Sequence, residues 1–359
     1  MTRIVAVRPV LASHRYPQSE LTAAIADLCE LDPSGRRLLA RLHESAGVRT
    51  RHLALPLPRY AELSGFGQSN DAFIETASEL AESAARSALT AAGLGPRDVD
   101  VVLTTTVTGI AVPALDARLA NRIGFRSDIR RLPLFGLGCV GGAAGIARAH
   151  DVLAEHETGL LISVELCSLT WQPGDSSTAN LVASALFGDG AAAVVLVGGG
   201  RPEPATEPAG QRHPNGPMVL ATRSVLYPET ERVMGWDVSD TGFRVVLGAD
   251  VPDVVRANLG RDVETFLADH DLSPDRIDRW ICHPGGPKVL EAVGDALRLP
   301  TDALALTRES LSRIGNVSSA SVLHVLHDTL LRRPADPGSY GMLLAMGPGF
   351  CSELVLLRF

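Results

Sequence analysis

Residues 134–145 of this 359-residue chain read LFGLGCVGGAAG. An apolar approach typical of a strand is broken by glycine and continues into small residues typical of a closely packed helix. Cys139 therefore lies where we expect a helix to begin, near Val140. Free N–H groups and the positive dipole end at such a position favour thiolate and lower a thiol pKa from about 8.5. The position predicts a nucleophile, although an ordinary buried cysteine is the alternative.

Helices and strands recur in the same order in the two halves of the sequence. In the first half an amphipathic helical period over 71–93 precedes the apolar strand 101–106. In the second half a similar period over 254–269 precedes the strand 279–283, and a Pro-containing turn separates helix from strand both times. The repeated order predicts an internal duplication.

The duplication extends through the cysteine. Aligning Cys139 with Asn316 places glycine before and valine after each of them. The same ungapped alignment matches Ala143 with Ala320, His150 with His327, Asp151 with Asp328 and Leu153 with Leu330. A further strand follows each helix, so the two halves share one pattern of helix, strand, helix and strand.

Two halves of this kind predict an α/β fold with strands buried between helices. The run 191–197 (AAAVVLV) is typical of a strand covered on both faces. We expect one half at residues 1–200, carrying the cysteine, and another at 217–359. The connection is expected at 198–217, where Gly, Pro, Glu and Arg support neither periodicity.

Composition excludes several classes of protein. The chain is 45% hydrophobic and 21% charged with a formal net charge of −8, which suits a globular protein and offers no electrostatic footprint for nucleic acid. Arg8 interrupts any signal-peptide core, and no apolar run reaches the roughly 18 residues of a membrane span. Five scattered cysteines without a CxxC spacing indicate neither a disulfide framework nor a metal site. We expect a cytoplasmic protein with free thiols.

The duplication also predicts a site of three residues. Cys139 and Asn316 occupy equivalent helix starts, and His283 ends the strand that precedes the second of them. A thiolate can carry an acyl group, while imidazole and carboxamide N–H groups can donate to a developing oxyanion. Taken singly, His283 is equally compatible with a satisfied buried histidine, and Asn316 with a helix cap. Their symmetry-related placement favours catalysis.

Four segments resemble type III polyketide synthases, the chalcone synthase-like enzymes, along nearly the whole chain. They are 186–193 (LFGDGAAA), 282–288 (CHPGGPK), 314–320 (IGNVSSA) and 346–349 (MGPG). The resemblance implies a thiolase-like αβαβα layered fold, a homodimer, and no cofactor beyond CoA thioester substrates. It implies an acyl-CoA starter held on Cys139, with His283 and Asn316 as the other catalytic residues, and extension by decarboxylative condensation of malonyl-CoA.

The same resemblance implies the lining of the substrate site. The substrate-binding positions are Phe187, Phe243, Val107, Val112, Cys167, Thr170 and Ser318, and the CoA-binding positions are Arg41 and Lys288. Phe187 is implied beside the malonyl carboxylate. Plant enzymes place threonine at the positions of Val107 and Cys167, so this pocket is expected to be less polar and to suit an aliphatic starter.

Within the family, three stretches look like bacterial alkylpyrone and alkylresorcinol synthases: 138–143 (GCVGGA), 165–173 (ELCSLTWQP) and 234–247. That likeness implies a medium- or long-chain fatty acyl starter and cyclisation to an alkylpyrone or alkylresorcinol. The alternatives are a tetrahydroxynaphthalene-type synthase that starts from malonyl-CoA, a ketoacyl-ACP synthase III-like enzyme, a Cys/His/Asn peptidase and a non-catalytic acyl-binding dimer partner. Starter length, number of extensions, cyclisation mode and delivery by a carrier protein are left open.

Overall fold

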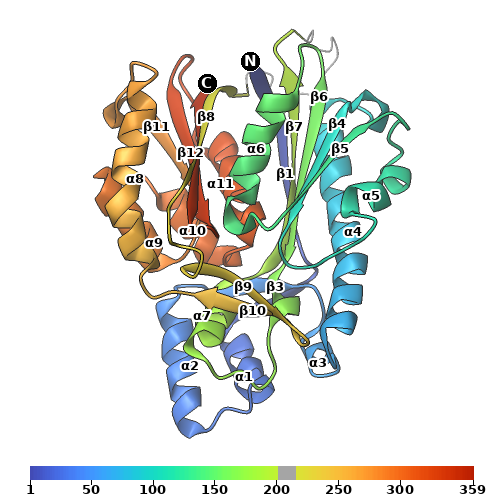
Figure 1. Ribbon diagram of the computed structural model, residues 1–359, viewed down its shortest axis with the longest axis vertical. Helices are drawn as coiled ribbons and strands as arrows, with labels where there is room; N and C mark the ends of the chain where they lie inside the picture. Colours follow the sequence, from blue (N-terminus) through green and yellow to red (C-terminus); the bar gives the residue numbers. More distant parts are fainter. Residues whose placement is uncertain (201–215) are drawn as a thin grey trace.

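One mixed sheet of nine strands organises the computed structural model, which describes residues 1–200 and 216–359 (Figure 1). In spatial order its strands are β11 (Ile277–Cys282), β12 (Tyr340–Gly347), β13 (Cys351–Arg358), β8 (Met218–Leu226), β1 (Thr2–Leu11), β7 (Asp189–Gly198), β6 (Thr158–Leu166), β4 (Val101–Thr106) and β5 (Arg130–Phe135). The two halves of the chain join where β1 pairs antiparallel with β8, at Thr2 with Val219 and Arg3 with Met218.

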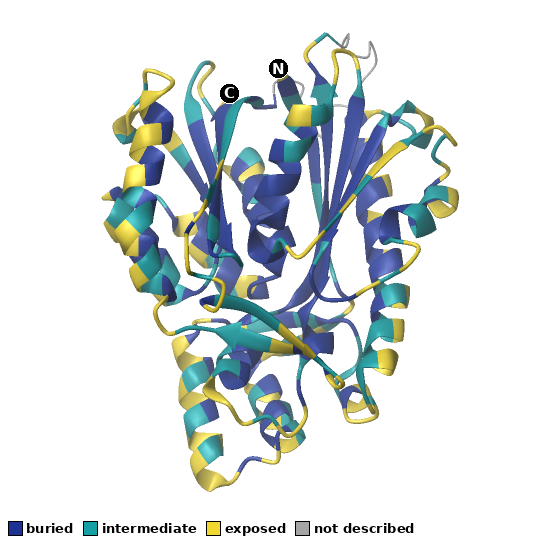
Figure 2. Ribbon diagram, in the orientation of Figure 1, coloured by how far each residue is buried: buried dark blue, intermediate teal, exposed yellow. Residues whose placement is uncertain are grey.

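Helices form three layers around this sheet. On the outer sides lie α4 (Phe66–Ala92) with α5 (Leu115–Ile123), and α8 (Val251–Ala268) with α9 (Pro287–Leu297). Between the two halves of the sheet lie α6 (Gly141–Val152) and α11 (Ser321–Arg332), which Figure 2 shows as buried over most of their length. The result is the αβαβα arrangement of the thiolase-like fold.

Strand β7 shows why the layers form. Alternate side chains of a strand point to opposite faces. Ala191, Ala193 and Val195 accordingly enter the apolar core beneath α4. Their neighbours Ala192, Val194 and Leu196 enter the core around α6 and α11. The predicted doubly covered strand is confirmed, because both faces need apolar residues.

The two central helices approach each other through small residues. At Gly142 an added Cβ would lie 2.2 Å from the backbone oxygen of Ser319 and 2.9 Å from Val322 Cγ1. Any larger residue would push α6 away from the turn that precedes α11. The run of small residues after Cys139 therefore reflects helix packing at the centre of the molecule.

The internal duplication is confirmed at the level of elements and differs in register. Helix α4, strand β4, helix α6 and strand β6 are repeated as α8, β11, α11 and β12. Cys139 lies within the 3-10 turn before α6 (Gly138–Val140), whereas Asn316 precedes the corresponding turn before α11 (Ser318–Ala320). The ungapped alignment was therefore wrong by about one helical turn. A shift of one turn keeps apolar residues aligned with apolar residues, so the sequence pattern does not reveal the error.

The remaining elements cover one end of the sheet. They comprise α1 (Gln18–Leu28), α2 (Pro33–Ser45), α3 (Leu57–Tyr60), α7 (Thr178–Leu186), α10 (Ala305–Ile314), the pair β2 (His14–Pro17) and β3 (Thr50–Leu53), and the hairpin of β9 (Met234–Ser239) and β10 (Gly242–Leu247). The hairpin crosses below the sheet in Figure 1. Most of the expected connection 198–217 lies outside the described residues. No described helix has the length and apolar character needed to cross a membrane.

Candidate active site

Cys139 lies in a strand–turn–helix connection at the centre of the fold. Its 3-10 turn follows β5 and leads directly into α6. Gly138 precedes it with a φ of +57°, and a Cβ there would lie 2.6 Å from Pro348 Cδ, so only glycine fits this turn. The cysteine itself is 6% exposed, with its Sγ 3.9 Å from Ser318 Oγ.

Asn316 is held between α10 and α11 by its own backbone and side chain. Its N–H donates to the Leu186 oxygen at 2.8 Å, and its backbone oxygen accepts from the Gly188 N–H at 2.9 Å. Its Oδ1 accepts from the Ser318 N–H at 2.9 Å and from Ser321 Oγ at 3.3 Å. Because Oδ1 is engaged, the side-chain amide N–H groups remain as the donors.

His283 follows β11 directly and faces the same space. Its backbone N–H donates to the Leu344 oxygen at 2.9 Å and its oxygen accepts from the Gly285 N–H at 3.0 Å, which fixes the main chain on both sides. Within the described residues, neither ring nitrogen has a hydrogen-bond partner, although both are buried. An imidazole held in this way retains its full capacity for a substrate.

One cavity brings the three predicted residues together. Cys139, His283 and Asn316 line a space of about 30 Å³ with Phe187 and Phe350. A second cavity of about 40 Å³ also touches Cys139 and Phe187. Both are smaller than the roughly 150 Å³ that accommodates benzene in an engineered apolar cavity. Neither has room for an extended acyl chain as it stands.

Burial dominates the electrostatics of the site. The sequence predicts a lowered thiol pKa, but desolvation raises the pKa of Cys139 to about 12, although hydrogen bonds from Ser318 and Asn316 act in the opposite direction. Desolvation likewise lowers the pKa of His283 to about 3. The predicted lowering of the Cys139 pKa was wrong, because a helix start in the core lacks the water that solvates a charge at the protein surface. A charged thiolate is favoured here only when a positive group appears beside it.

The predicted substrate-binding residues divide into two groups. Val107, Cys167, Phe187 and Ser318 line the second cavity beside Cys139. Val112, Thr170 and Phe243 line neither cavity around Cys139.

Each of these three has a different surrounding. Val112 is 90% exposed on the loop before α5. Thr170 is buried, and its Oγ1 donates to the Cys167 oxygen at 2.7 Å. Phe243 is buried against Phe66, with ring centroids 5.2 Å apart. The structure therefore contradicts a cavity-lining position for these side chains within one chain.

The two predicted CoA contacts are exposed cations on separate helices. Arg41 lies near the end of α2, and Lys288 is the second residue of α9. Neither lines the cavities around Cys139. Among the described residues, no group of three His, Cys, Asp or Glu side chains is placed to hold a metal ion.

Sequence reasoning missed a buried carboxylate next to the site. Glu165 lies at the end of β6 and is fully buried. Its Oε2 accepts from the Val107 N–H at 3.0 Å and from Thr108 Oγ1 at 2.9 Å, and its Oε1 accepts from Ser319 Oγ at 2.5 Å. Burial raises the pKa of Glu165 to about 7. An acidic residue inside an otherwise apolar strand was the available signal.

It also missed the wall formed by the β9–β10 hairpin. Met234 and Leu247 line both cavities, and Trp236 and Val245 line the second. The signal was two short strands of alternating character around a Ser-Asp-Thr-Gly turn.

Comparison with known proteins agrees with this geometry. Residues 4–201 match the N-terminal domain of chalcone and stilbene synthases, and residues 217–359 match the C-terminal domain. The chain is 58% identical over 360 residues to a 1,3,6,8-tetrahydroxynaphthalene synthase of Streptomyces peucetius subsp. caesius, covering 100% of this chain and 93% of that one. It is 36% identical over 333 residues to a putative chalcone synthase of Bacillus subtilis, covering 90% and 89%.

A solved structure is similar over the same extent. The crystal structure of 1,3,6,8-tetrahydroxynaphthalene synthase from Streptomyces coelicolor, a bacterial type III polyketide synthase, superimposes with a TM-score of 0.90 at 30% identity, covering 100% of this chain and 99% of that one. Family match, fold and cavity agree, and the chain belongs to the chalcone and stilbene synthase family of type III polyketide synthases.

Proposed function

We propose that this enzyme is a tetrahydroxynaphthalene-type synthase that uses malonyl-CoA as both starter and extender. The observation that carries the proposal is the 58% identity, over the whole chain, to the relative of that name.

A medium- or long-chain fatty acyl starter is the second candidate. The alkylpyrone-like motifs favour it, and the apolar side chains of Val107, Val246 and Leu247 in the cavity wall support it.

Loading begins at Cys139. Its Sγ attacks the thioester carbonyl of the starter, and the thiol proton passes to His283, so that a new C–S bond forms and the bond to CoA breaks. The departing CoA thiolate takes up the proton. The thiolate of Cys139 and the imidazolium of His283 form together. The attraction between these two charges offsets the desolvation penalty that keeps each group neutral when the other is uncharged.

Decarboxylation follows in the same cavity. Loss of CO2 from malonyl-CoA leaves an enolate, and its oxygen accepts hydrogen bonds from His283 and the amide N–H of Asn316. Donors aimed at such a developing charge are each worth about 3 to 4 kcal/mol. Phe187 presents an apolar surface to the malonyl carboxylate and so favours its conversion to neutral CO2.

Condensation completes the cycle. The enolate carbon attacks the acyl carbon on Cys139, which forms a carbon–carbon bond and releases the thiolate. The chain, now two carbons longer, is a CoA thioester, and Cys139 attacks that thioester and releases CoA before the next round. Arg41 and Lys288 are proposed to contact CoA phosphates, since exposed cations bind phosphate oxygens as charge-assisted partners.

Product analysis with malonyl-CoA alone tests the proposed function. We expect the purified enzyme to convert malonyl-CoA to 1,3,6,8-tetrahydroxynaphthalene, detected by chromatography and mass spectrometry against a standard. Adding decanoyl-CoA should leave most of the product unchanged. Turnover that requires an acyl-CoA starter, with an alkylpyrone or alkylresorcinol as product, would reject this assignment in favour of the second candidate.

We also propose that two copies of the chain pair through the edge of the large sheet. Strand β5 forms that edge, and Phe135 at its end is 55% exposed. Val112 is 90% exposed and Ile110 40% exposed on the loop after the adjacent strand β4. An unpaired edge flanked by apolar side chains favours pairing with a second copy about a twofold axis.

Sedimentation velocity tests the homodimer. The unmodified chain is expected to sediment as a dimer, and the double variant Phe135→Asp, Val112→Asp as a monomer, because charge at the interface must be desolvated. Leu331→Asp changes an exposed leucine (56%) on α11 and is the matched control that should remain dimeric. A dimer of unchanged stability in the double variant would place the interface elsewhere.

A further inference from the structure

The β9–β10 hairpin is a wall of the active-site cavity that stands apart from the main sheet. In the part of the chain that the structure describes, its two strands pair only with each other, from Gly242 with Ser239 to Leu247 with Met234. Side chains from both strands line the space beside Cys139. Its position therefore depends on side-chain contacts.

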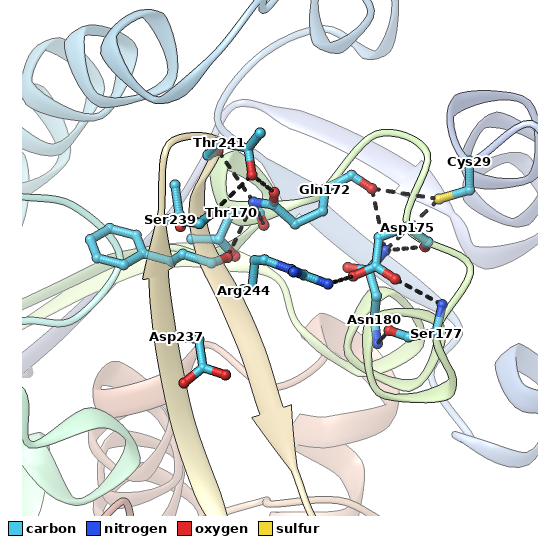
Figure 3. A network of polar contacts seen from close by, with 12 residues as sticks. Cys29, Thr170, Gln172, Asp175, Ser177, Asn180, Asp237, Ser239, Thr241 and Arg244 are labelled. Atoms are coloured by element: carbon cyan, nitrogen blue, oxygen red, sulfur yellow. Dashed lines mark hydrogen bonds and ion pairs between the residues drawn. The ribbon is translucent and has the colours of Figure 1, made fainter.

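Gln172 makes most of the polar contacts to the tip of this hairpin (Figure 3). Its Nε2 donates to the Phe243 oxygen at 3.2 Å and reaches the Thr241 oxygen at 3.5 Å. Its Oε1 accepts from Thr241 Oγ1 at 2.7 Å. Nε2 also donates to the Thr170 oxygen at 3.2 Å, within the turn that follows β6. Gln172, which is 6% exposed, thus connects the tip of the hairpin to the turn that follows β6.

Gln172 is itself anchored to a rigid element. Its backbone oxygen accepts from Asn180 Nδ2 at 3.4 Å, and the same Nδ2 donates to the Asp175 oxygen at 2.8 Å. Asn180 lies on α7, which ends at Leu186, directly before the cavity residue Phe187. The tip of the hairpin is therefore tied to the helix that positions the opposite side of the cavity.

The tip has two further contacts, one ionic and one apolar. Arg244 and Asp175 form an ion pair at 3.7 Å, but the arginine side chain is 56% exposed and such pairs contribute little. Phe243 packs edge-on against Phe66. Gly242 lies beside the same Phe66 ring, since a Cβ there would be 3.2 Å from it. These contacts are short-range and apolar or solvent-screened.

The cavity is too small for a growing chain unless one wall moves. The two spaces beside Cys139 measure about 30 and 40 Å³. The inner strands of the main sheet are bonded to a neighbouring strand on both sides, whereas the polar contacts that hold the tip of the hairpin come mostly from Gln172. We propose that Gln172 is a positioning residue that limits the outward movement of the hairpin and thereby the size of the acyl chain accepted on Cys139. This inference rests on the proposed function.

Starter discrimination tests the role of Gln172. Gln172→Met keeps the length of the side chain and removes its donors and acceptor. Thr241→Val removes the bond to Gln172 Oε1 together with the contact of Thr241 Oγ1 to Ser239 Oγ inside the hairpin. We expect the ratio of kcat/KM for decanoyl-CoA to kcat/KM for malonyl-CoA to rise at least fivefold in Gln172→Met and at least twofold in Thr241→Val. Arg86→Ala breaks side-chain bonds to Glu82 and Arg122 far from the hairpin, and should leave the ratio unchanged.

A ratio separates positioning from mere stability, because loss of folded enzyme lowers both values by the same factor. A ratio unchanged in both variants overturns the proposal, even if Tm falls. If Gln172→Met does not fold, Thr241→Val decides alone. Wild-type enzyme that makes no product from malonyl-CoA alone rejects the proposed function only. The ratio of decanoyl-CoA to hexanoyl-CoA then tests Gln172 instead.

Discussion

Cys139→Ala is expected to lower polyketide formation by about 10⁴-fold or more. The variant has no sulfur to carry the acyl group, so the condensation loses its covalent intermediate, and removing a nucleophile from a catalytic set costs nearly the whole chemical acceleration. Decarboxylation of malonyl-CoA should persist, because its enolate is stabilised by His283 and Asn316. The expected products are therefore CO2 and acetyl-CoA, quantified by mass spectrometry.

The other cysteine beside the cavity provides the control. Cys167 lines the second cavity with Cys139, is similarly buried, and follows β6 instead of preceding α6. Cys167→Ala should keep condensation within about tenfold of wild type, since it removes only packing. Full condensation by Cys139→Ala would remove the acyl-enzyme mechanism. A collapse of activity in Cys167→Ala alone would move the nucleophile to that residue.

Asn316→Ala is expected to slow malonyl-CoA decarboxylation by about 10² to 10³-fold, the usual cost of one oxyanion donor. Acylation of Cys139, followed by intact-protein mass spectrometry, should slow by less than tenfold, because His283 still accepts the thiol proton. The asymmetry between the two steps is the diagnostic result. An equal or larger loss in acylation would make Asn316 a residue of the loading step.

Asn316 also anchors backbone, so a second variant separates the two roles. Its Oδ1 accepts from the Ser318 N–H and from Ser321 Oγ. Asn316→Asp keeps an acceptor there and lacks the amide donor, so decarboxylation should stay slow while Tm recovers. Ser321→Ala removes the Val317 and Asn316 contacts without touching the donor, and should lower Tm more than decarboxylation. Decarboxylation restored in Asn316→Asp would show that anchoring alone was responsible.

The structure brings Cys139, His283 and Asn316 to one cavity, as the symmetry of the two halves predicted, whereas local solvation and side-chain direction differ from the prediction. Cys139, His283 and Asn316 were found because repeated elements bring them to one cavity, and an error of one helical turn in the alignment did not matter at that scale. Val112 and Phe243 were placed by likeness to a family pocket. Strand direction and loop course instead leave one exposed and the other packed on Phe66.

Likeness of short motifs and likeness over the whole chain favour different starters. The stretches 138–143, 165–173 and 234–247 looked like alkylpyrone synthases, whereas the chain is 58% identical over its length to a tetrahydroxynaphthalene synthase. Each of the three stretches contributes residues to the cavities beside Cys139, so product analysis must decide between the two starters. The starter depends on cavity shape, to which the distant hairpin residues Met234 and Leu247 contribute.

The sequence by itself determined the layered α/β fold, its duplication and the three residues proposed to react, because periodicity and the order of elements are local properties that burial then enforces. Only the tertiary structure showed that burial opposes charge on Cys139 and His283, since the elements that bury them lie far apart in the chain. It alone also showed that Gln172 contacts the hairpin about seventy residues further on, because no local pattern encodes such a contact.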